Sequence, residues 1–202
     1  LQCEYWWLII IALIVCTGII NAYNFMDGIN GITGGYSLII LGALAYINAE
    51  MVTFVESALI YTVLCSVVVF CFFNFRRKAK CFAGDVGSVS IAFILLFLIG
   101  KLILKTEDFS WIILLAVYGV DSVLTIIHRL MLHENIGLPH RKHMYQLMAN
   151  ELKIPHVVVS LAYMVVQAIV IIGYIYCQNW GYLYLLCAIL LLSFIYIWFM
   201  RK

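Results

Sequence analysis

Residues 5–35 read YWWLIIIALIVCTGIINAYNFMDGINGITGG, and this stretch decides the class of fold. The apolar run over residues 5–20 approaches the length of a bilayer-crossing helix, which needs roughly 17 to 25 apolar residues. Polar side chains follow it at once, at three-residue steps: Asn21, Asn24, Asp27 and Asn30. The pattern predicts a membrane-spanning helix that ends in a polar site.

The rest of the chain has the same apolar character. Of its 202 residues, 66% are hydrophobic and 11% are charged, whereas a soluble domain has about half and about a quarter. The short alternating segments of a transmembrane β-barrel do not appear. We therefore expect an all-α, polytopic transmembrane helix bundle that forms one integral-membrane domain over residues 1–202. Its seven predicted spans are 5–20, 32–49, 57–73, 86–104, 110–128, 156–177 and 182–200.

The distribution of basic residues predicts how this bundle is oriented. The polar connections 21–31, 74–85 and 129–155 fall on one side of the membrane, together with the C-terminus. Ten of the twelve lysine and arginine residues lie on that side, and Lys101 and Lys105 are the exceptions. By the positive-inside rule this side faces the cytoplasm. Three loops at one membrane face can form a single site.

The first connection carries oxygen ligands at helical spacing. Asn21, Asn24 and Asp27 recur at i, i+3 and i+6, so on a helical turn they would share roughly one face. Carboxamide and carboxylate oxygens are hard ligands that suit Mg²⁺. A helix cap, which Asn and Asp also favour, would explain one or two of these residues. Four at regular spacing favour a metal or substrate site.

The second connection ends in CFAGDVGSVSIAF, residues 81–93, where Asp85 follows Gly84 at the start of a span. A helix N-terminus favours a carboxylate, and its free N–H groups can bind phosphate oxygens. A simple helix cap is the alternative reading. The basic residues just before this segment either orient the protein or attract an anionic substrate or lipid headgroup; they are Arg76, Arg77, Lys78 and Lys80.

In the third connection, LPHRKHMYQ (residues 138–146), His140 and His143 bracket Arg141 and Lys142. Two cations between the histidines argue against a zinc site. Clustered cationic donors suit a diphosphate or a sugar instead, and a solvated loop is the alternative.

Asp121 lies inside the predicted span 110–128, where a carboxylate is costly and marks a candidate functional residue. A bend near Gly119 would let it face the cytoplasmic site. A structural partner such as His128, seven residues further on, is the other reading.

Together these segments resemble a known family. NAYNFMDGINGI resembles the N-x-x-N-x-x-D-G-x-[DN]-G-[LI] signature of the polyprenyl-phosphate N-acetylhexosamine-1-phosphate transferases of glycosyltransferase family 4. CFAGDVGS resembles their F-x-G-D-x-G-S motif, and PHRKH their H-R-x-H motif. The three motifs occur in the family's order and on one predicted membrane face.

The resemblance implies a role for each matching residue. Asp85 and Asn24 would be ligands of Mg²⁺, with Mn²⁺ as an alternative, and Asp27 an active-site carboxylate near the nucleotide. The aromatic ring of Phe82 would stack on uracil. The remaining residues implied are catalytic His140, Arg141 and His143, and substrate-binding Asn21, Asn30, Gly84, Asp121 and Lys142.

The implied reaction moves N-acetylhexosamine-1-phosphate from a UDP-sugar to undecaprenyl or another polyprenyl phosphate, and it releases UMP. In the family this initiates synthesis of cell-envelope polysaccharide or O-antigen at the cytoplasmic face of the bacterial inner membrane. Tyr145–Gln146 stands where the peptidoglycan-precursor enzymes have His-His, which favours the O-antigen branch. The implied partners are UDP-N-acetylhexosamine, polyprenyl phosphate and the bilayer, with no nucleic acid; a homodimer is left open.

The chain also departs from the family pattern. It opens at Leu1, and no Asp-Asp pair lies on the predicted cytoplasmic side, so we expect the C-terminal part of a longer enzyme, inactive alone. The approach to the metal motif is one residue longer than usual, which makes a role for Asn74 doubtful. A non-catalytic scaffold or degenerate relative remains an alternative, and so does a small-solute transporter. A transporter would place its polar residues near mid-bilayer and show internal repeats.

Overall fold

The computed structural model describes residues 6–135, 138 and 141–200, and this part of the chain is helical with no β-strand. Six helical segments in the described residues are long and apolar enough to cross a membrane, and a shorter apolar helical stretch covers Ile9–Phe25. The predicted all-α, polytopic membrane bundle is therefore confirmed. The α-helices are α1 (Trp6–Phe25), α2 (Ile32–Tyr46), α3 (Ser57–Asn74), α4 (Gly84–Thr106), α5 (Ala116–Met131), α6 (Met144–Gln146), α7 (His156–Tyr176) and α8 (Gly181–Met200).

Four shorter helical segments complete the backbone. Two are π-helical, η2 (Ile47–Met51) after α2 and η4 (Leu147–Glu151) after α6. Two are 3₁₀-helical, η3 (Phe109–Leu115) before α5 and η5 (Gln178–Trp180) before α8.

Helix α1 is predicted to end at residue 20 and ends at Phe25. Asn21 and Asn24 therefore lie on the last turns of the helix, not in a loop. Polar side chains do not break a helix, and the first residue after the apolar run that favours a break is Gly28.

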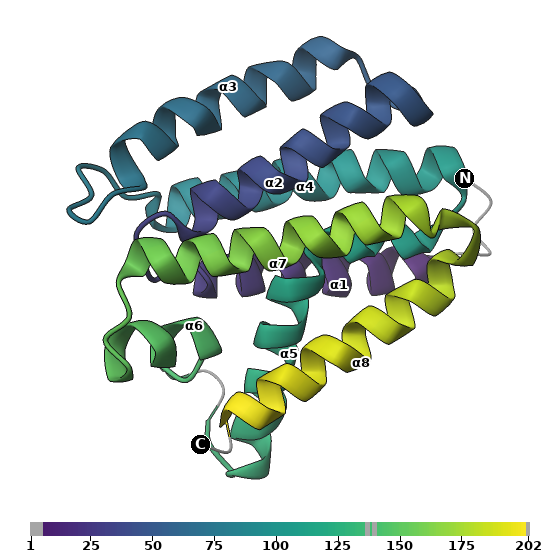
Figure 1. The fold of residues 1–202 in the computed structure, drawn as a ribbon. Helices are drawn as coiled ribbons and strands as arrows, with labels where there is room; N and C mark the ends of the chain where they lie inside the picture. Colours follow the sequence, from purple (N-terminus) through teal and green to yellow (C-terminus); the bar gives the residue numbers. More distant parts are fainter. Residues whose placement is uncertain (1–5, 136–137, 139–140, 201–202) are drawn as a thin grey trace.

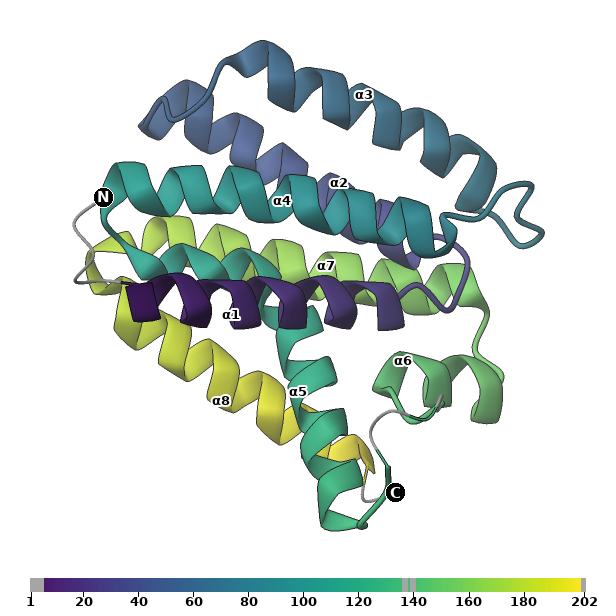
Figure 2. The same ribbon diagram turned by 180° about the vertical axis from the view of Figure 1, so that it is seen from behind.

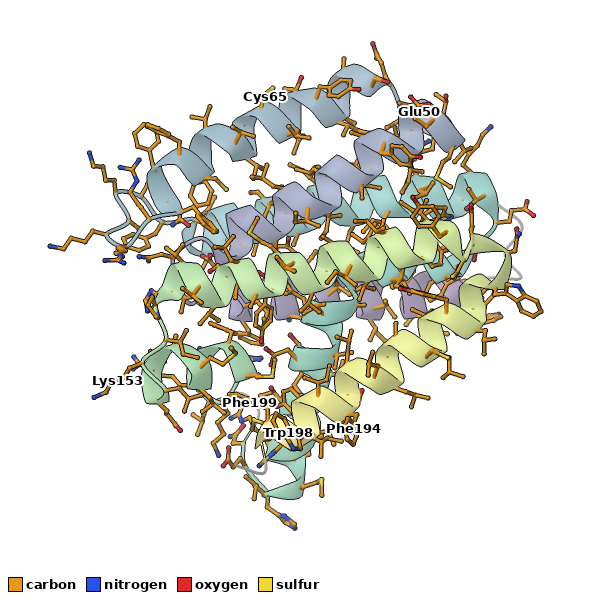
Figure 3. The ribbon with its side chains drawn as sticks, viewed as in Figure 1. Glu50, Cys65, Lys153, Phe194, Trp198 and Phe199 are labelled. Carbon is orange, nitrogen blue, oxygen red and sulfur yellow. The ribbon has the colours of Figure 1, made fainter. Side chains whose placement is uncertain are left out.

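The arrangement of the helices brings the three motif-bearing segments to one end of the bundle. Figures 1 and 2 show α1, α2, α4 and α7 running alongside one another, with the α1–α2 and α3–α4 connections and α6 at one end. The α2–α3, α4–η3 and α7–α8 connections lie at the opposite end. In Figure 3, Lys153 lies at the first end and Glu50 at the second.

Helix α5 runs across the direction of α1 and α7 in both ribbon views (Figures 1 and 2). The change of direction occurs where η3 gives way to α5 at Leu115, four residues before the predicted bend at Gly119. Such a break removes regular helical hydrogen bonds, and hydrocarbon offers no water to replace them. Gln167 of α7 takes their place, because its Nε2 donates to Ile113 O at 3.0 Å and its Oε1 accepts from Val117 N at 3.1 Å.

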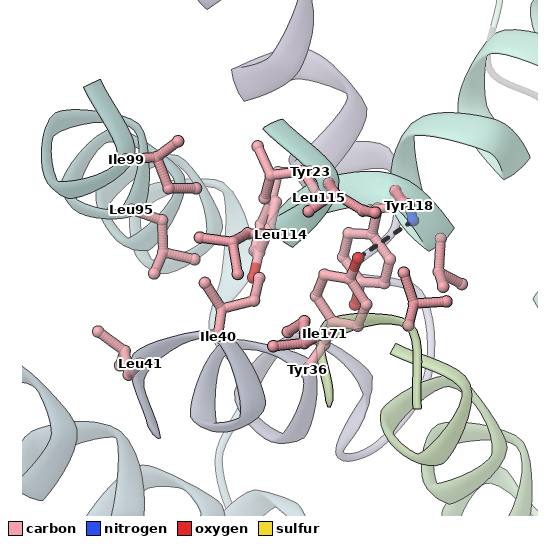
Figure 4. Packing of buried hydrophobic residues seen from close by; sticks show 14 of the residues in the cluster. Tyr23, Tyr36, Ile40, Leu41, Leu95, Ile99, Leu114, Leu115, Tyr118 and Ile171 are labelled. Atoms are coloured by element: carbon pink, nitrogen blue, oxygen red, sulfur yellow. Dashed lines mark hydrogen bonds between the residues drawn. The ribbon is translucent and has the colours of Figure 1, made fainter. Parts of the chain in front are cut away.

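Tyrosine side chains fill the core beside this break (Figure 4). The rings of Tyr36 and Tyr118 stack with centroids 3.7 Å apart and planes 4° apart. The Tyr36 hydroxyl donates to Gln167 Oε1 at 2.6 Å, and Tyr23 Oη lies 2.6 Å from Ser37 Oγ. Since Tyr23 precedes Asn24 on α1 and Tyr36 lies near the start of α2, this cluster holds the two helix ends that flank the first motif.

Candidate active site

The first motif begins on the last turns of α1. Asn21 is exposed there, whereas Asn24 is half-buried and faces α4. The Ser88 hydroxyl donates to Asn24 Oδ1 at 2.5 Å. Ser88 is three residues after Asp85, close to one helical turn, so this bond joins the first motif to the second.

Asp27 follows in the connection to α2 and is also half-buried. Burial raises the pKa of its carboxyl group, hydrogen bonds from the Thr33 hydroxyl and the Gly84 backbone lower it, and the negative charge of Asp85 raises it again. The Thr33 Oγ1 donor lies 2.6 Å from Asp27 Oδ1. The two motif carboxylates are thus close enough to repel each other.

These residues fit a divalent cation. Asp85 is exposed in the first turn of α4, Asp27 lies beside it, and Asn24 adds a carboxamide oxygen from α1. A cation would relieve the repulsion between the two carboxylates, and Mg²⁺ is usually held by one or two carboxylates with water and substrate phosphates completing its shell. Among the residues that the structure describes, no three His, Cys, Asp or Glu side chains cluster as metal ligands, so substrate oxygens and water would have to complete the shell of such a cation.

Phe82 lies next to these carboxylates and is 73% exposed. Together with Thr33, Ala83 and Gly87, it lines a groove of about 270 Å³ between α2, α3 and α4. Gly84, which directly precedes Asp85, has a φ of +60°, a conformation that glycine adopts without strain.

Asn74 and Asn30 form hydrogen bonds between the α1–α2 connection and the α3–α4 connection. Asn74 Oδ1 accepts from Gly31 N at 2.7 Å, and its Nδ2 donates to Cys81 O at 2.8 Å. Asn30 Nδ2 donates to the backbone carbonyls of Arg76 and Arg77, at 3.1 and 3.3 Å. Asn74 therefore has a structural role despite the longer approach to the metal motif. Asn30 is also a residue predicted to bind substrate, and in the structure its carboxamide nitrogen donates to these backbone carbonyls.

The third motif packs against the end of α1. The Tyr145 hydroxyl donates to Phe25 O at 2.8 Å, and a Cβ added to Gly28 would lie 2.2 Å from that hydroxyl oxygen. The ring of His143 stacks on Phe25, with centroids 6.5 Å apart. Burial and then the negative charge of Asp121 raise the pKa of Tyr145, and the charge of Asp27 adds to the shift. All three motifs thus meet at the α1–α2 connection.

Asp121 and His143 lie inside the protein, each 2% exposed. Their side chains pair with each other, with His143 Nδ1 3.3 Å from Asp121 Oδ1. Asp121 thus contacts His143 of the third motif, and no contact with His128 on its own helix is seen among the described residues. The side chains of both predicted site residues are therefore buried.

The cationic residues of the third motif differ in their surroundings. Arg141 is exposed, while the Lys142 ammonium forms an ion pair with Glu134. The hydrogen bond from Lys142, followed by one from Arg129, lowers the pKa of Glu134. Arg129 also donates to the carbonyls of Asn135 and Leu138, which folds this connection back on itself. His140 lies outside the described residues.

Several residues of the site were not predicted from the sequence: Thr33, Ser88, Tyr145 and Tyr163. Ser88 could have been found, because it lies one turn after Asp85 on the same helix. Thr33 lies six residues from Asp27 across a turn, and Tyr163 contacts Asp121 from another helix, so no local pattern indicates them.

The sequence is similar to those of known proteins. The profile of glycosyl transferase family 4 matches residues 1–103. A Bacillus subtilis protein described as a "Probable undecaprenyl-phosphate N-acetylglucosaminyl 1-phosphate transferase" is 32% identical over 133 residues, which cover 63% of this chain and 37% of that protein. The "Phospho-N-acetylmuramoyl-pentapeptide-transferase" of Lactobacillus acidophilus is 35% identical over 74 residues, 37% of this chain and 23% of that protein.

A third relative, also described as a "Phospho-N-acetylmuramoyl-pentapeptide-transferase", comes from Symbiobacterium thermophilum. It is 33% identical over 119 residues, 58% of this chain and 34% of that protein. The chain thus spans between 23% and 37% of the length of these three curated relatives. Because the family profile covers 103 of 202 residues, just over half, the chain belongs to glycosyl transferase family 4.

Proposed function

We propose that this chain forms part of a transferase that moves N-acetylhexosamine-1-phosphate from a UDP-sugar to a polyprenyl phosphate. The observation that carries the proposal is the meeting of Asn24, Asp27 and Asp85 at one end of a membrane bundle. The family membership supports the same chemistry. The proposed setting is the cytoplasmic face of a bacterial inner membrane, where the basic connections lie at the same end as this site.

Two hollows near the site support the proposal of two unlike substrates. An apolar cavity of about 360 Å³ lies between α1, α5 and α8, and its lining includes Ala22 and Tyr23 from the same turns of α1 as Asn21 and Asn24. We assign this cavity to the isoprenoid chain of the acceptor. The groove beside Phe82 is the proposed place for the uracil ring of the donor.

In the proposed reaction, an acceptor phosphate oxygen forms a bond to the β-phosphorus of the UDP-sugar. The bond from that phosphorus to the oxygen bridging to the α-phosphate breaks, and UMP leaves with the electron pair. The acceptor phosphate is largely dianionic at neutral pH, since its second pKa is about 6, so no strong base is required. The main obstacle is the approach of two anions.

The residues of this chain address that obstacle. Asp85, Asp27 and Asn24 would hold Mg²⁺, which when bound supplies charge neutralisation and alignment of the phosphate groups. Arg141, which is exposed, and Lys142 offer further positive charge to the diphosphate. In this reaction one substrate lies in lipid and the other in water. That explains why the side-chain oxygens of Asn24, Asp27 and Asp85 lie near an apolar cavity.

The test is the Asp85→Asn variant, made in the protein expressed from its complete reading frame. We expect Mg²⁺-dependent release of UMP from UDP-N-acetylhexosamine to fall about a hundredfold or more, which is the effect usual for losing an electrostatic group at a reacting centre. UMP release is measured in membranes supplied with polyprenyl phosphate.

The matched control is Glu56→Gln, which also removes a carboxylate from a helix start, at the N-cap of α3. Glu56 lies at the opposite end of the bundle, so this variant should keep its activity. Near-normal turnover of the Asp85→Asn variant would reject Asp85 as a metal ligand. Absence of UMP release from the unmodified protein would reject the proposed function.

A further inference from the structure

Asp121 holds its carboxylate in the interior of the protein with a set of hydrogen bonds from three parts of the chain. Tyr163 Oη of α7 donates to Oδ2 at 2.6 Å, and Thr125 Oγ1, one turn along α5, donates to Oδ1 at 3.2 Å. The backbone N–H of Met144 donates to Oδ1 at 3.1 Å. His143 Nδ1 lies 3.3 Å from the same oxygen. Such a set offsets the cost of burying a carboxylate, which is otherwise large.

Two of these contacts involve residues at the start of α6. Met144 is the first residue of α6, and His143 is its N-cap residue. The Asp121 carboxylate therefore contacts the two residues at which α6 begins. Beyond this bond, the His143 ring lies between Phe25 and Tyr145, 6.5 and 5.9 Å from their ring centroids. Asp121 thereby joins α5 to the junction between α6 and the end of α1.

The residues that this junction places are the cations of the third motif. Arg141 and Lys142 directly precede His143 in the chain, so the anchored ring limits where they can reach. Tyr145, two residues after it, is bonded to Phe25 and lies near enough to Asp27 to be affected by its charge. The anchored segment is thus adjacent to the carboxylate site.

We propose that Asp121 is a positioning residue that acts through His143, holding Arg141 and Lys142 where they bind the donor diphosphate. The inference rests on the proposed function, and it gives the two buried residues a role without substrate contact. Their burial favours anchoring, because a side chain 2% exposed presents almost no surface to a soluble nucleotide. Fixing the cations beforehand spares the cost of ordering them when substrate binds.

The decisive experiment compares His143→Asn with His143→Ala in the protein from the complete reading frame. The Asn side chain can supply an N–H near the position of Nδ1, so it keeps the bond to Asp121, whereas Ala removes it. We expect the KM for the UDP-sugar to stay within about threefold of the unmodified value in His143→Asn. It should rise about tenfold or more in His143→Ala with little change in kcat, the pattern for lost uniform binding. If both variants lose affinity equally, the ring itself contacts substrate and the proposal is overturned.

Asp121→Asn tests the same contact from the other side, because the amide replaces one acceptor oxygen of Asp121 with a donor. We expect a KM increase like that of His143→Ala, and no further increase when the two changes are combined, since residues acting as one unit are not additive. Multiplying effects in the double variant would mean that Asp121 acts independently of His143, and would overturn the proposal.

The matched control is Asp108→Asn at the other end of η3–α5. The Asp108 carboxylate accepts from Ser110 N at 2.9 Å, Ser110 Oγ at 2.6 Å and Tyr174 Oη at 3.3 Å, so its loss removes a comparable set of bonds. We expect lower thermal stability with an unchanged KM. A KM increase equal to that of Asp121→Asn would mean general loosening of the fold and would reject a positioning role.

A readout independent of turnover separates this inference from the proposed function. Amide hydrogen exchange in the segment from Arg141 to Glu151 should be faster in Asp121→Asn than in the unmodified protein, and unchanged in Asp108→Asn. Unchanged exchange in Asp121→Asn would overturn the anchoring even if the protein transfers sugar phosphate. Faster exchange in a protein without UMP release would reject the proposed function and leave the anchoring in place.

Discussion

At the scale of single residues, Gly31 shows how strictly the site is built. Its φ of +86° is a left-handed conformation that side chains other than glycine rarely adopt, and its N–H donates to Asn74 Oδ1 at 2.7 Å. A Cβ added here would lie 2.2 Å from Cδ2 of Phe75. Only glycine therefore suits this position, because the backbone is left-handed and Phe75 of the α3–α4 connection lies against it.

We expect Gly31→Ala to lower the free energy of unfolding by about 2 kcal/mol or more, because a left-handed L-residue costs about 1–2 kcal/mol before any steric clash. Gly42→Ala is the matched control, since Gly42 lies inside α2 with nothing within 4 Å of its added Cβ. There alanine should be neutral or stabilising by up to about 1 kcal/mol. Thermal unfolding in detergent measures both, and equal melting temperatures would contradict the prediction.

At the scale of elements, the break between η3 and α5 is what carries Asp121 to the third motif. The predicted span 110–128 would cross the membrane if its helix were continuous, whereas the observed α5 runs across its neighbours (Figure 1). Gln167 stabilises this geometry by bonding Ile113 O, Val117 N and the Tyr36 hydroxyl. Its side chain is fully buried.

We expect Gln167→Leu to destabilise the protein by about 3 kcal/mol or more, because each buried polar group left unpaired costs about 1–3 kcal/mol. Thr62→Val is the control, as the Thr62 hydroxyl is exposed and donates only to Ala58 O of its own helix. This change should alter stability by less than about 0.5 kcal/mol. If urea or thermal unfolding gave the two variants the same stability, Gln167 would not support the break.

At the scale of the whole molecule, the motif-bearing connections lie at one end of the bundle and the acidic residue Glu50 lies at the other (Figure 3). A cysteine in place of Lys153 should react with a membrane-impermeant maleimide only from the cytoplasmic side, because the positive-inside rule places this end there. A cysteine in place of Glu50 should react only from outside. Labelling is compared with that of the parent protein, because this chain alone carries seven cysteines, and the opposite pattern would refute the orientation.

Much of the helical framework follows from the sequence. Predicted spans such as 57–73 and 182–200 match α3 and α8 almost residue for residue, since long apolar runs bounded by charged or polar residues have few other structures available in a bilayer. Hydropathy places the end of α1 too early, because it does not distinguish polar residues on a helix from polar residues in a loop. The role of Asn74 could not be predicted, because its partners, Gly31 and Cys81, are set by folding and not by spacing.

The sequence alone was enough for the helical class, the approximate spans, and the candidate groups Asn24, Asp27 and Asp85, because hydropathy and motif spacing are local properties of the chain. Only the folded structure paired Asp121 with His143 and turned α5 across the bundle. Those features depend on side chains more than 20 residues apart, whose contacts are decided by which buried donors and acceptors remain unpaired once the helices have packed.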